Sequence, residues 1–260
     1  MKVDIIQLRG PAPKRQCDFA IADMVQRARV RGHDVHFPQD VFGSSLITRS
    51  RNRSLRHVRW DGDFVLFVDD DMLPMQGALT RLMGHNVPVV SALCTTRTIP
   101  ATLTVKHYNS ETGDFKVVDQ FQEETLIKGP WAPGFGFILI KTSVLKFILE
   151  YVLGAHDWLD SNRKLFDRLH SRAEFREAER ERLAAVRRRM WEAEQYAPIF
   201  QLPLHTERQQ EIGEDSYFAK MLHQTGTEVW LDTGCLVGHV GEFPYSPLNF
   251  GMRHVSEVQL

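Results

Sequence analysis

A run of five apolar residues followed directly by three aspartates constrains the fold of this chain more than any other stretch. Phe64 to Val68 predicts a short strand buried on both faces, as in a parallel sheet covered by helices. Asp69, Asp70 and Asp71 then stand at its carboxyl end, where open α/β sheets bind ligands. The adjacent carboxylates repel one another, and Mg²⁺ or Mn²⁺ would offset that repulsion. A solvated acidic turn before Pro74 is the alternative interpretation.

Composition gives few further limits. The 260 residues fit one large domain or two small ones, and the net charge of -1 gives no overall argument for binding nucleic acid or membrane. No apolar run has the length of a membrane span or a signal peptide. The three cysteines are odd in number and widely spaced, which predicts neither a zinc site nor a disulfide framework and makes a reducing cytoplasm the expected location.

Strand and helix patterns alternate along the first third of the chain, which predicts a mixed α/β fold with a mainly parallel central sheet flanked by helices. Residues 1–241 are expected to form one domain, and 242–260 a tail without periodicity. The expected strands are 3–8, 35–37, 64–68, 87–93, 137–140, 229–231 and 235–241, and the expected helices are 17–31, 44–59, 77–85, 142–152 and 213–223.

Two segments depart from this alternation. Residues 102–118 predict a hairpin around a turn-rich loop. Residues 161–196 are dense in Arg, Glu, Leu and Ala and predict a long helical insertion. That helix is either a solvated element that packs one stripe on the domain, or an insertion for acceptor binding or self-association into a homo-oligomer.

Three further stretches carry candidate functional residues. The loop 128–136 holds two prolines, three glycines and Trp131, whose ring either plugs the core or forms a platform for a ligand. Glu214 and Asp215 open a helix, where acids also serve as caps. His239 stands between two glycines in a strand, where a lone histidine is more often structural than a ligand.

The helix expected at 44–59 is rich in arginine and contains no acid. Most of these arginines are expected to form a solvated basic face, and one of them is a candidate to face the phosphates or the base of a nucleotide. If they converged with the arginines of the 161–196 helix, the joint surface would suit a nucleic acid.

Four features in this order resemble the glycosyltransferases of the GT-A fold, and most closely the inverting family-2-type enzymes. They are the strand ending in Asp-x-Asp, the glycine-aromatic loop before a strand, the Glu-Asp pair opening a helix, and the late Gly-His strand. The resemblance spans residues 3–241 apart from the long helix. It implies a Rossmann-like GT-A sheet.

The resemblance also implies roles for individual residues. Asp71, Asp69 and His239 match the positions that hold Mn²⁺ or Mg²⁺ against the two phosphates of a donor. Asp215 matches the general base, and Glu214 its neighbour near the acceptor. The residues expected to contact the nucleotide sugar are Asp69, Asp70, Arg51, Arg9, Trp131, Gly134 and Gly136.

The implied reaction moves a sugar from a UDP-sugar, or less favourably a GDP-sugar, to an acceptor hydroxyl with inversion. The acceptor is a glycan, a small molecule or a modified nucleic acid. One difference from the family leaves the nucleotide base of the donor undetermined. The family places an acid after the second strand, and this chain offers only Asp40 there. The alternatives are a nucleotidyltransferase, which also needs a metal at a carboxylate-tipped strand, and a non-catalytic module that binds nucleotide sugars.

Overall fold

The computed structural model describes residues 1–9, 14–38, 47–97, 101–118, 121, 125–151, 204–205, 210–211, 213–241 and 244–245. The chain divides into two compact units, one formed by Met1–Leu145 and Phe200–Leu260 and the other by Lys146–Ile199. The predicted helix at 161–196 lies outside the described residues. Everything below concerns the first unit.

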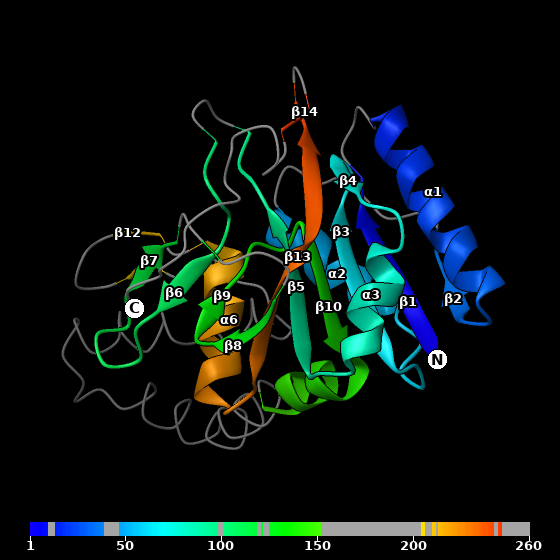
Figure 1. Cartoon of the computed structure of the whole chain (residues 1–260). Helices are drawn as coiled ribbons and strands as arrows, with labels where there is room; N and C mark the ends of the chain where they lie inside the picture. Colours follow the sequence, from blue (N-terminus) through cyan, green and yellow to red (C-terminus); the bar gives the residue numbers. More distant parts are fainter. Residues whose placement is uncertain are drawn as a thin grey trace, which may run out of the picture. The chain divides into compact units, whose positions relative to one another are not determined.

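Within the described residues, nine strands form the main sheet (Figure 1). Its path runs β14-β13-β5-β10-β3-β1-β2, while β4 and β8 also pair with β13. The strands are β1 (Lys2–Leu8), β2 (Asp34–His36), β3 (Phe64–Asp69), β4 (Met72–Pro74), β5 (Val89–Cys94), β8 (Leu126–Gly129), β10 (Phe137–Lys141), β13 (Val229–Val240) and β14 (Pro244–Tyr245).

Five strands along this path, β2, β1, β3, β5 and β13, run in one direction. β1 pairs in parallel with both β2 and β3, and β5 pairs in parallel with β13. β10 lies between β3 and β5 and is antiparallel to both, so it runs opposite to these five strands. The predicted mixed α/β class with a mainly parallel, Rossmann-like central sheet is confirmed.

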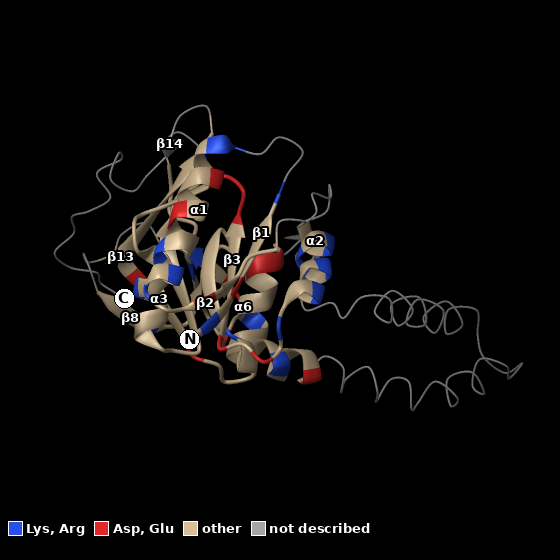
Figure 2. Ribbon diagram, turned by 90° about the vertical axis from the view of Figure 1, so that its right-hand side faces the viewer, with Lys and Arg blue, Asp and Glu red and all other residues tan. Residues whose placement is uncertain are grey.

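Helices lie on both faces of this sheet. Figure 2 shows α1 (Arg15–Val30) and α3 (Ala78–His85) on one side of β1 and β3, with α2 (Ile47–Ser54) on the other side. The 3₁₀ turn η1 (Leu55–His57) continues α2, and α6 (Glu214–Gln224) places Phe218 against Phe135. Because both faces are covered, β3 is apolar from Phe64 to Val68, as its sequence predicts, and Asp69 is its last residue.

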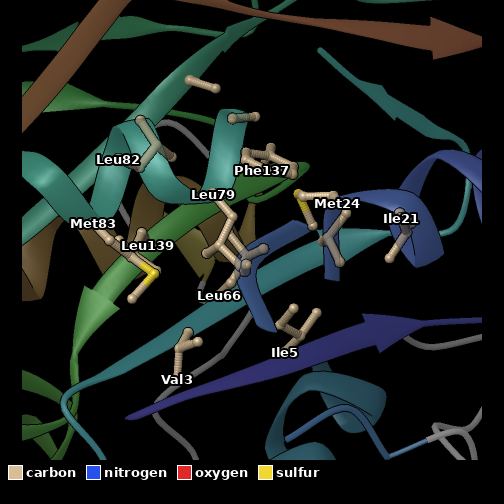
Figure 3. Packing of buried hydrophobic residues seen from close by; sticks show 14 of the residues in the cluster. Val3, Ile5, Ile21, Met24, Leu66, Leu79, Leu82, Met83, Phe137 and Leu139 are labelled. Carbon is tan, nitrogen blue, oxygen red and sulfur yellow. The ribbon is translucent and has the colours of Figure 1, made fainter. Parts of the chain in front are cut away.

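The core under α1 and α3 is apolar and closely packed (Figure 3). Alternate residues of β1 and β3 point to this face, while the intervening residues of the same strands face the opposite layer. Each fully buried Leu, Ile or Phe contributes about 1.5–3 kcal/mol through removal from water. The members labelled in Figure 3 are Val3, Ile5, Ile21, Met24, Leu66, Leu79, Leu82, Met83, Phe137 and Leu139.

Two smaller sheets also occur among the described residues of this unit. The predicted hairpin is confirmed as β6 (Lys106–Tyr108) and β7 (Phe115–Val117), and β9 (Trp131–Ala132) adds to β6 as a third antiparallel strand. β11 (Leu204–His205) pairs with β12 (Gln210–Glu211).

The end of the chain differs from expectation in two places. The two strands predicted at 229–231 and 235–241 form one strand, β13, with an irregularity in register between Asp232 and Leu236. The predicted tail also contains β14, in which Tyr245 pairs with His239. The buried carboxylate of Asp232 accepts hydrogen bonds from the backbone N–H groups of Gly234 and Cys235, in the segment that joins the two predicted strands.

The three cysteines, Cys17, Cys94 and Cys235, are free and buried. No helix among the described residues combines the length and the apolar character needed to cross a membrane.

Candidate active site

The acidic end of β3 is fixed by backbone hydrogen bonds on two sides. The N–H of Asp69 donates to the carbonyl of Gly136 at 3.1 Å, which ties the strand end to the glycine-rich loop. The carbonyl of Asp71 accepts from the N–H of Val240 at 2.8 Å, which ties the next turn to the end of β13. The strand, the loop and the late histidine strand therefore meet at the carboxyl edge of the sheet, as the sequence predicts.

Asp71 lies between two cationic or titratable side chains. Its Oδ1 is 3.1 Å from Nε2 of His239, and its Oδ2 is 2.8 Å from Nη1 of Arg97. The Asp71 side chain is 11% exposed, whereas that of Arg97 is 55% exposed. A nearly buried carboxylate thus has one enclosed partner and one partner that reaches it from solvent.

The second hydrogen bond of His239 fixes its tautomer. Nδ1–H donates to the carbonyl of Thr95 at 2.6 Å, so the neutral ring carries its lone pair on Nε2, facing Asp71. Two lone pairs 3.1 Å apart repel unless a proton or a metal ion lies between them. Metal-binding histidines commonly donate their other ring N–H to a backbone carbonyl in this way.

The pKa values of the pair shift as this geometry requires. Burial alone would raise the pKa of Asp71, but the hydrogen bond from His239 and the charges of His239 and Arg97 outweigh it and leave that pKa below its usual range. Burial alone would lower the pKa of His239, yet the Asp71 and Thr95 hydrogen bonds leave it raised. The site therefore favours a cationic group beside the Asp71 carboxylate.

Arg51 joins the acidic strand end to α6. Its Nη2 lies 3.4 Å from Oδ1 of Asp69, and its Nε lies 3.4 Å from Oε1 of Glu214. The guanidinium carbon lies 4.8 Å from the ring centroid of Phe135. Arg51 is only 2% exposed, and neither its Nη1 nor its Nε forms a hydrogen bond among the described residues. Nε lies at ion-pair distance from Glu214, whereas Nη1 has no such neighbour among these residues.

Asp69 is bound to Arg51 rather than to the Asp71–His239 pair. Burial raises the pKa of Asp69, and the Asp71 charge adds to that effect, while the Arg51 charge opposes it. Within the described residues, no three His, Cys, Asp or Glu side chains gather as a metal-binding group. The predicted set of three ligands is therefore not assembled here: Asp71 and His239 lie together, and Asp69 faces Arg51.

Glu214 and Asp215 begin α6 as predicted. Oδ1 of Asp215 accepts from the N–H of Ser216 at 2.6 Å and from its hydroxyl at 3.3 Å, and Lys106 donates to that hydroxyl at 2.9 Å. A Cβ atom on Gly213 would lie 2.8 Å from the same oxygen, so a glycine suits this position. Asp215 is a partly buried residue of the first turn of α6, where an acid complements the helix dipole, and its role as a general base stays a prediction.

The loop residues pack tightly against the strand end. A Cβ atom at Gly136 would lie 2.1 Å from Cε of Met72, and one at Gly134 would lie 3.1 Å from Cβ of Thr104. Trp131 is 4% exposed and donates its indole N–H to the carbonyl of Ile127 at 3.1 Å. The burial favours a core plug over a ligand platform, and contact of this ring with a sugar stays a prediction.

The remaining candidates lie near the same edge. Arg9 follows β1, lies 3.3 Å from the side chain of Gln7 through Nε, and pairs with Asp18 through Nη2 at 3.4 Å. Asp70 lies in the turn after β3 and is partly buried. The segment that contains Asp40 lies outside the described residues, so the donor base stays open.

The predicted basic helix is present in part as α2, whose arginine positions are blue on the ribbon of Figure 2. Arg49 and Arg56 are exposed, while Arg51 is buried in the site. Arg59 turns to Asp4 and Asp34 and joins strands rather than a ligand. Nucleic-acid binding by the exposed arginines stays a prediction.

Sequence reasoning missed Arg97 and Thr95. Both follow β5, and the carboxyl end of that strand meets the same sheet edge as the end of β3. The sequence signal for both residues is that they are polar and directly follow a buried strand of the parallel sheet.

No protein-family model matches the chain, and no curated protein matches it. Among solved structures, one that is similar is 4-diphosphocytidyl-2C-methyl-D-erythritol synthase from Anaerococcus prevotii DSM 20548, with 10% identity and a TM-score of 0.32. The match covers 86% of this chain and 96% of that one. A likeness this distant assigns no activity to this chain.

Proposed function

We propose that this chain is a metal-dependent glycosyltransferase of the GT-A type, which transfers a sugar from a nucleoside-diphosphate sugar to an acceptor hydroxyl. The observation that carries the proposal is the Asp71–His239 pair, in which Thr95 directs the Nε2 lone pair toward a nearly buried carboxylate. A carboxylate and an imidazole suit Mn²⁺ or Mg²⁺, with the other coordination positions left to phosphate oxygens and water.

The donor set fits such a cation, since Asp71 and His239 would hold it at the tip of β3. When bound, the cation would supply Lewis-acid stabilisation of the departing diphosphate. The unpartnered Nη1 of Arg51 supports a role in binding a donor oxygen nearby.

The acceptor side is assigned to the start of α6. Glu214 contacts the same arginine as Asp69, so the first turn of this helix lies beside the acidic strand end. Asp215 is the next residue and keeps one carboxylate oxygen, Oδ2, for the proton of an attacking hydroxyl. Attack from the face opposite the diphosphate inverts the anomeric carbon. UDP is the preferred base, and GDP is the second choice.

Calorimetry tests the binding half of this proposal. UDP and GDP are titrated into wild type, Asp71→Ala and the control Asp61→Asn, each with and without Mn²⁺. Asp61 is a suitable control because it is exposed and pairs with Lys2 away from the site. Mn²⁺-dependent affinity in the wild type and the control, lost in Asp71→Ala, is expected. Equal affinity in all conditions contradicts the proposal.

Product analysis tests the chemical half. Incubation with nucleotide sugars is expected to release nucleoside diphosphate, and Asp215→Asn is expected to lower that rate by about 10²–10⁴-fold without weakening UDP binding. Release of pyrophosphate from nucleoside triphosphates would instead identify a nucleotidyltransferase. Binding without turnover by either wild type or Asp215→Asn would identify a non-catalytic module.

A further inference from the structure

The contact between Arg97 and Asp71 has no role in the mechanism above. Nη1 of Arg97 holds Oδ2 of Asp71 at 2.8 Å, while His239 holds Oδ1 of the same carboxylate. Both oxygens that a cation would coordinate therefore already have partners. The two partners differ in burial, because His239 is 13% exposed and Arg97 is 55% exposed.

We infer that Arg97 is a displaceable counter-ion that occupies the cation site of Asp71 and competes with a divalent metal for that carboxylate. The inference rests on the cation site of the proposed function and adds a residue to it. A guanidinium and a divalent cation on one carboxylate repel each other at close range, so binding of one disfavours the other.

Burial decides which partner leaves. Thr95 anchors His239 through its Nδ1–H, and the ring is enclosed, so it stays in place. Arg97 reaches Asp71 from solvent and regains water when it is released, which makes its ion pair weak. Asp71 is thus neutralised at all times, first by the arginine and then by the metal, and no nearly buried carboxylate is left uncompensated.

Once released from Asp71, Arg97 is free to bind a second ligand at the same place. A diphosphate held by the metal brings negative charge to the site, and a guanidinium is a strong partner for phosphate oxygens. Arg97 therefore acts in opposite directions on two ligands: it weakens binding of the metal alone and strengthens binding of the nucleoside diphosphate. A purely structural arginine would not separate the two affinities.

Mn²⁺ titrations of the full chain without nucleotide test the first effect. Arg97→Ala and Arg97→Gln are expected to bind Mn²⁺ about three- to tenfold more tightly than wild type, since no cation has to be displaced. Arg27→Ala is the matched control, because Arg27 forms an exposed pair with Asp23 on α1, and its Mn²⁺ affinity is expected to equal that of wild type. Asp71→Asn is expected to lose Mn²⁺ binding.

UDP titrations at saturating Mn²⁺ test the second effect, with about tenfold weaker binding expected for Arg97→Ala. Unchanged or weaker Mn²⁺ affinity in both Arg97 variants, undetectable Mn²⁺ binding in every protein, or unchanged UDP affinity would overturn the inference. Failure of the proposed function is distinguishable. If Arg97→Ala tightens Mn²⁺ and weakens UDP but no sugar is transferred, the competition stands and the transferase assignment falls. If sugar transfer needs Mn²⁺ and the Arg97 variants bind Mn²⁺ like wild type, the transferase assignment stands and the competition falls.

Discussion

Replacement of Asp232 tests whether the irregular middle of β13 is held by one buried carboxylate. Asp232 is fully buried and accepts from Nε and Nη2 of Arg81 at 2.7 and 2.9 Å, and it lies 2.6 Å from Nε2 of His85. It also accepts from the N–H groups of Gly234 and Cys235 at 3.0 and 3.1 Å. One carboxylate thus fixes α3 and the strand that ends near the site.

The magnitude follows from which partners each variant loses. Asp232→Asn keeps an oxygen for the two backbone donors but loses the charge opposite Arg81. Removing one member of a buried pair costs about 3–5 kcal/mol, and because Arg81 and His85 are partly exposed, this variant is expected to lose about 2–4 kcal/mol. Asp232→Ala also strands two backbone donors and is expected to cost about 3–5 kcal/mol or more.

Urea unfolding followed by circular dichroism measures these free energies. Asp23→Asn serves as the control, because it breaks an exposed ion pair within α1 and is expected to unfold like wild type. A loss of less than about 1 kcal/mol in Asp232→Ala would refute the reasoning, because it would mean that the five contacts of this buried carboxylate contribute little to the stability of the fold.

The pH dependence of the same variants gives a second check. Burial would raise the pKa of Asp232, but hydrogen bonds from Arg81 and His85 outweigh it and leave the pKa below its usual range. A depressed folded-state pKa gives stability that is present above the unfolded value of about 3.9 and is lost as the pH falls through the folded-state pKa. The difference between wild type and Asp232→Asn is therefore expected to be constant above about pH 5 and to shrink below about pH 4.

Substitutions at Arg51, Gly136 and Trp131 test the site further. Arg51→Met leaves two carboxylates without their shared cation and is expected to cost about 3–5 kcal/mol in urea unfolding; a loss below about 1 kcal/mol would contradict the buried bridge. Gly136→Ala pushes a methyl group into Met72 and is expected to cost about 1–3 kcal/mol, with less than additive loss in the double variant Gly136→Ala, Met72→Val; strict additivity would argue against the contact. Trp131→Phe is expected to keep UDP affinity while Trp131→Ala lowers stability by about 3–5 kcal/mol, and a selective loss of UDP binding would restore the platform interpretation.

The sequence predicts those strands and helices of the site whose burial follows from the pattern of apolar residues along a short segment. β3 is predictable because five consecutive apolar residues need cover on both faces. α6 is predictable because a glycine and two acids precede an apolar helical stripe. β3 ends and α6 begins at the same edge of the sheet, which brings Asp71, His239 and Glu214 into one region.

What the sequence does not predict depends on distant partners. The reversed direction of β10 is invisible, because an apolar strand has the same pattern whichever way it runs. The continuity of β13 depends on Arg81 and His85, which lie more than a hundred residues away along the chain. The pairing of Asp69 with Arg51 rather than with a metal site also needs the folded arrangement of α2, since all its arginines look alike in sequence.

Anomalous diffraction from crystals soaked with Mn²⁺ and UDP tests the central claim most directly. The account predicts a manganese peak about 2.1 Å from Nε2 of His239 and from a carboxylate oxygen of Asp71, with UDP phosphate oxygens on the same ion and Arg97 moved off that carboxylate. Bound UDP with manganese elsewhere, or with the contacts of Asp71 to Arg97 and His239 unchanged, would contradict it.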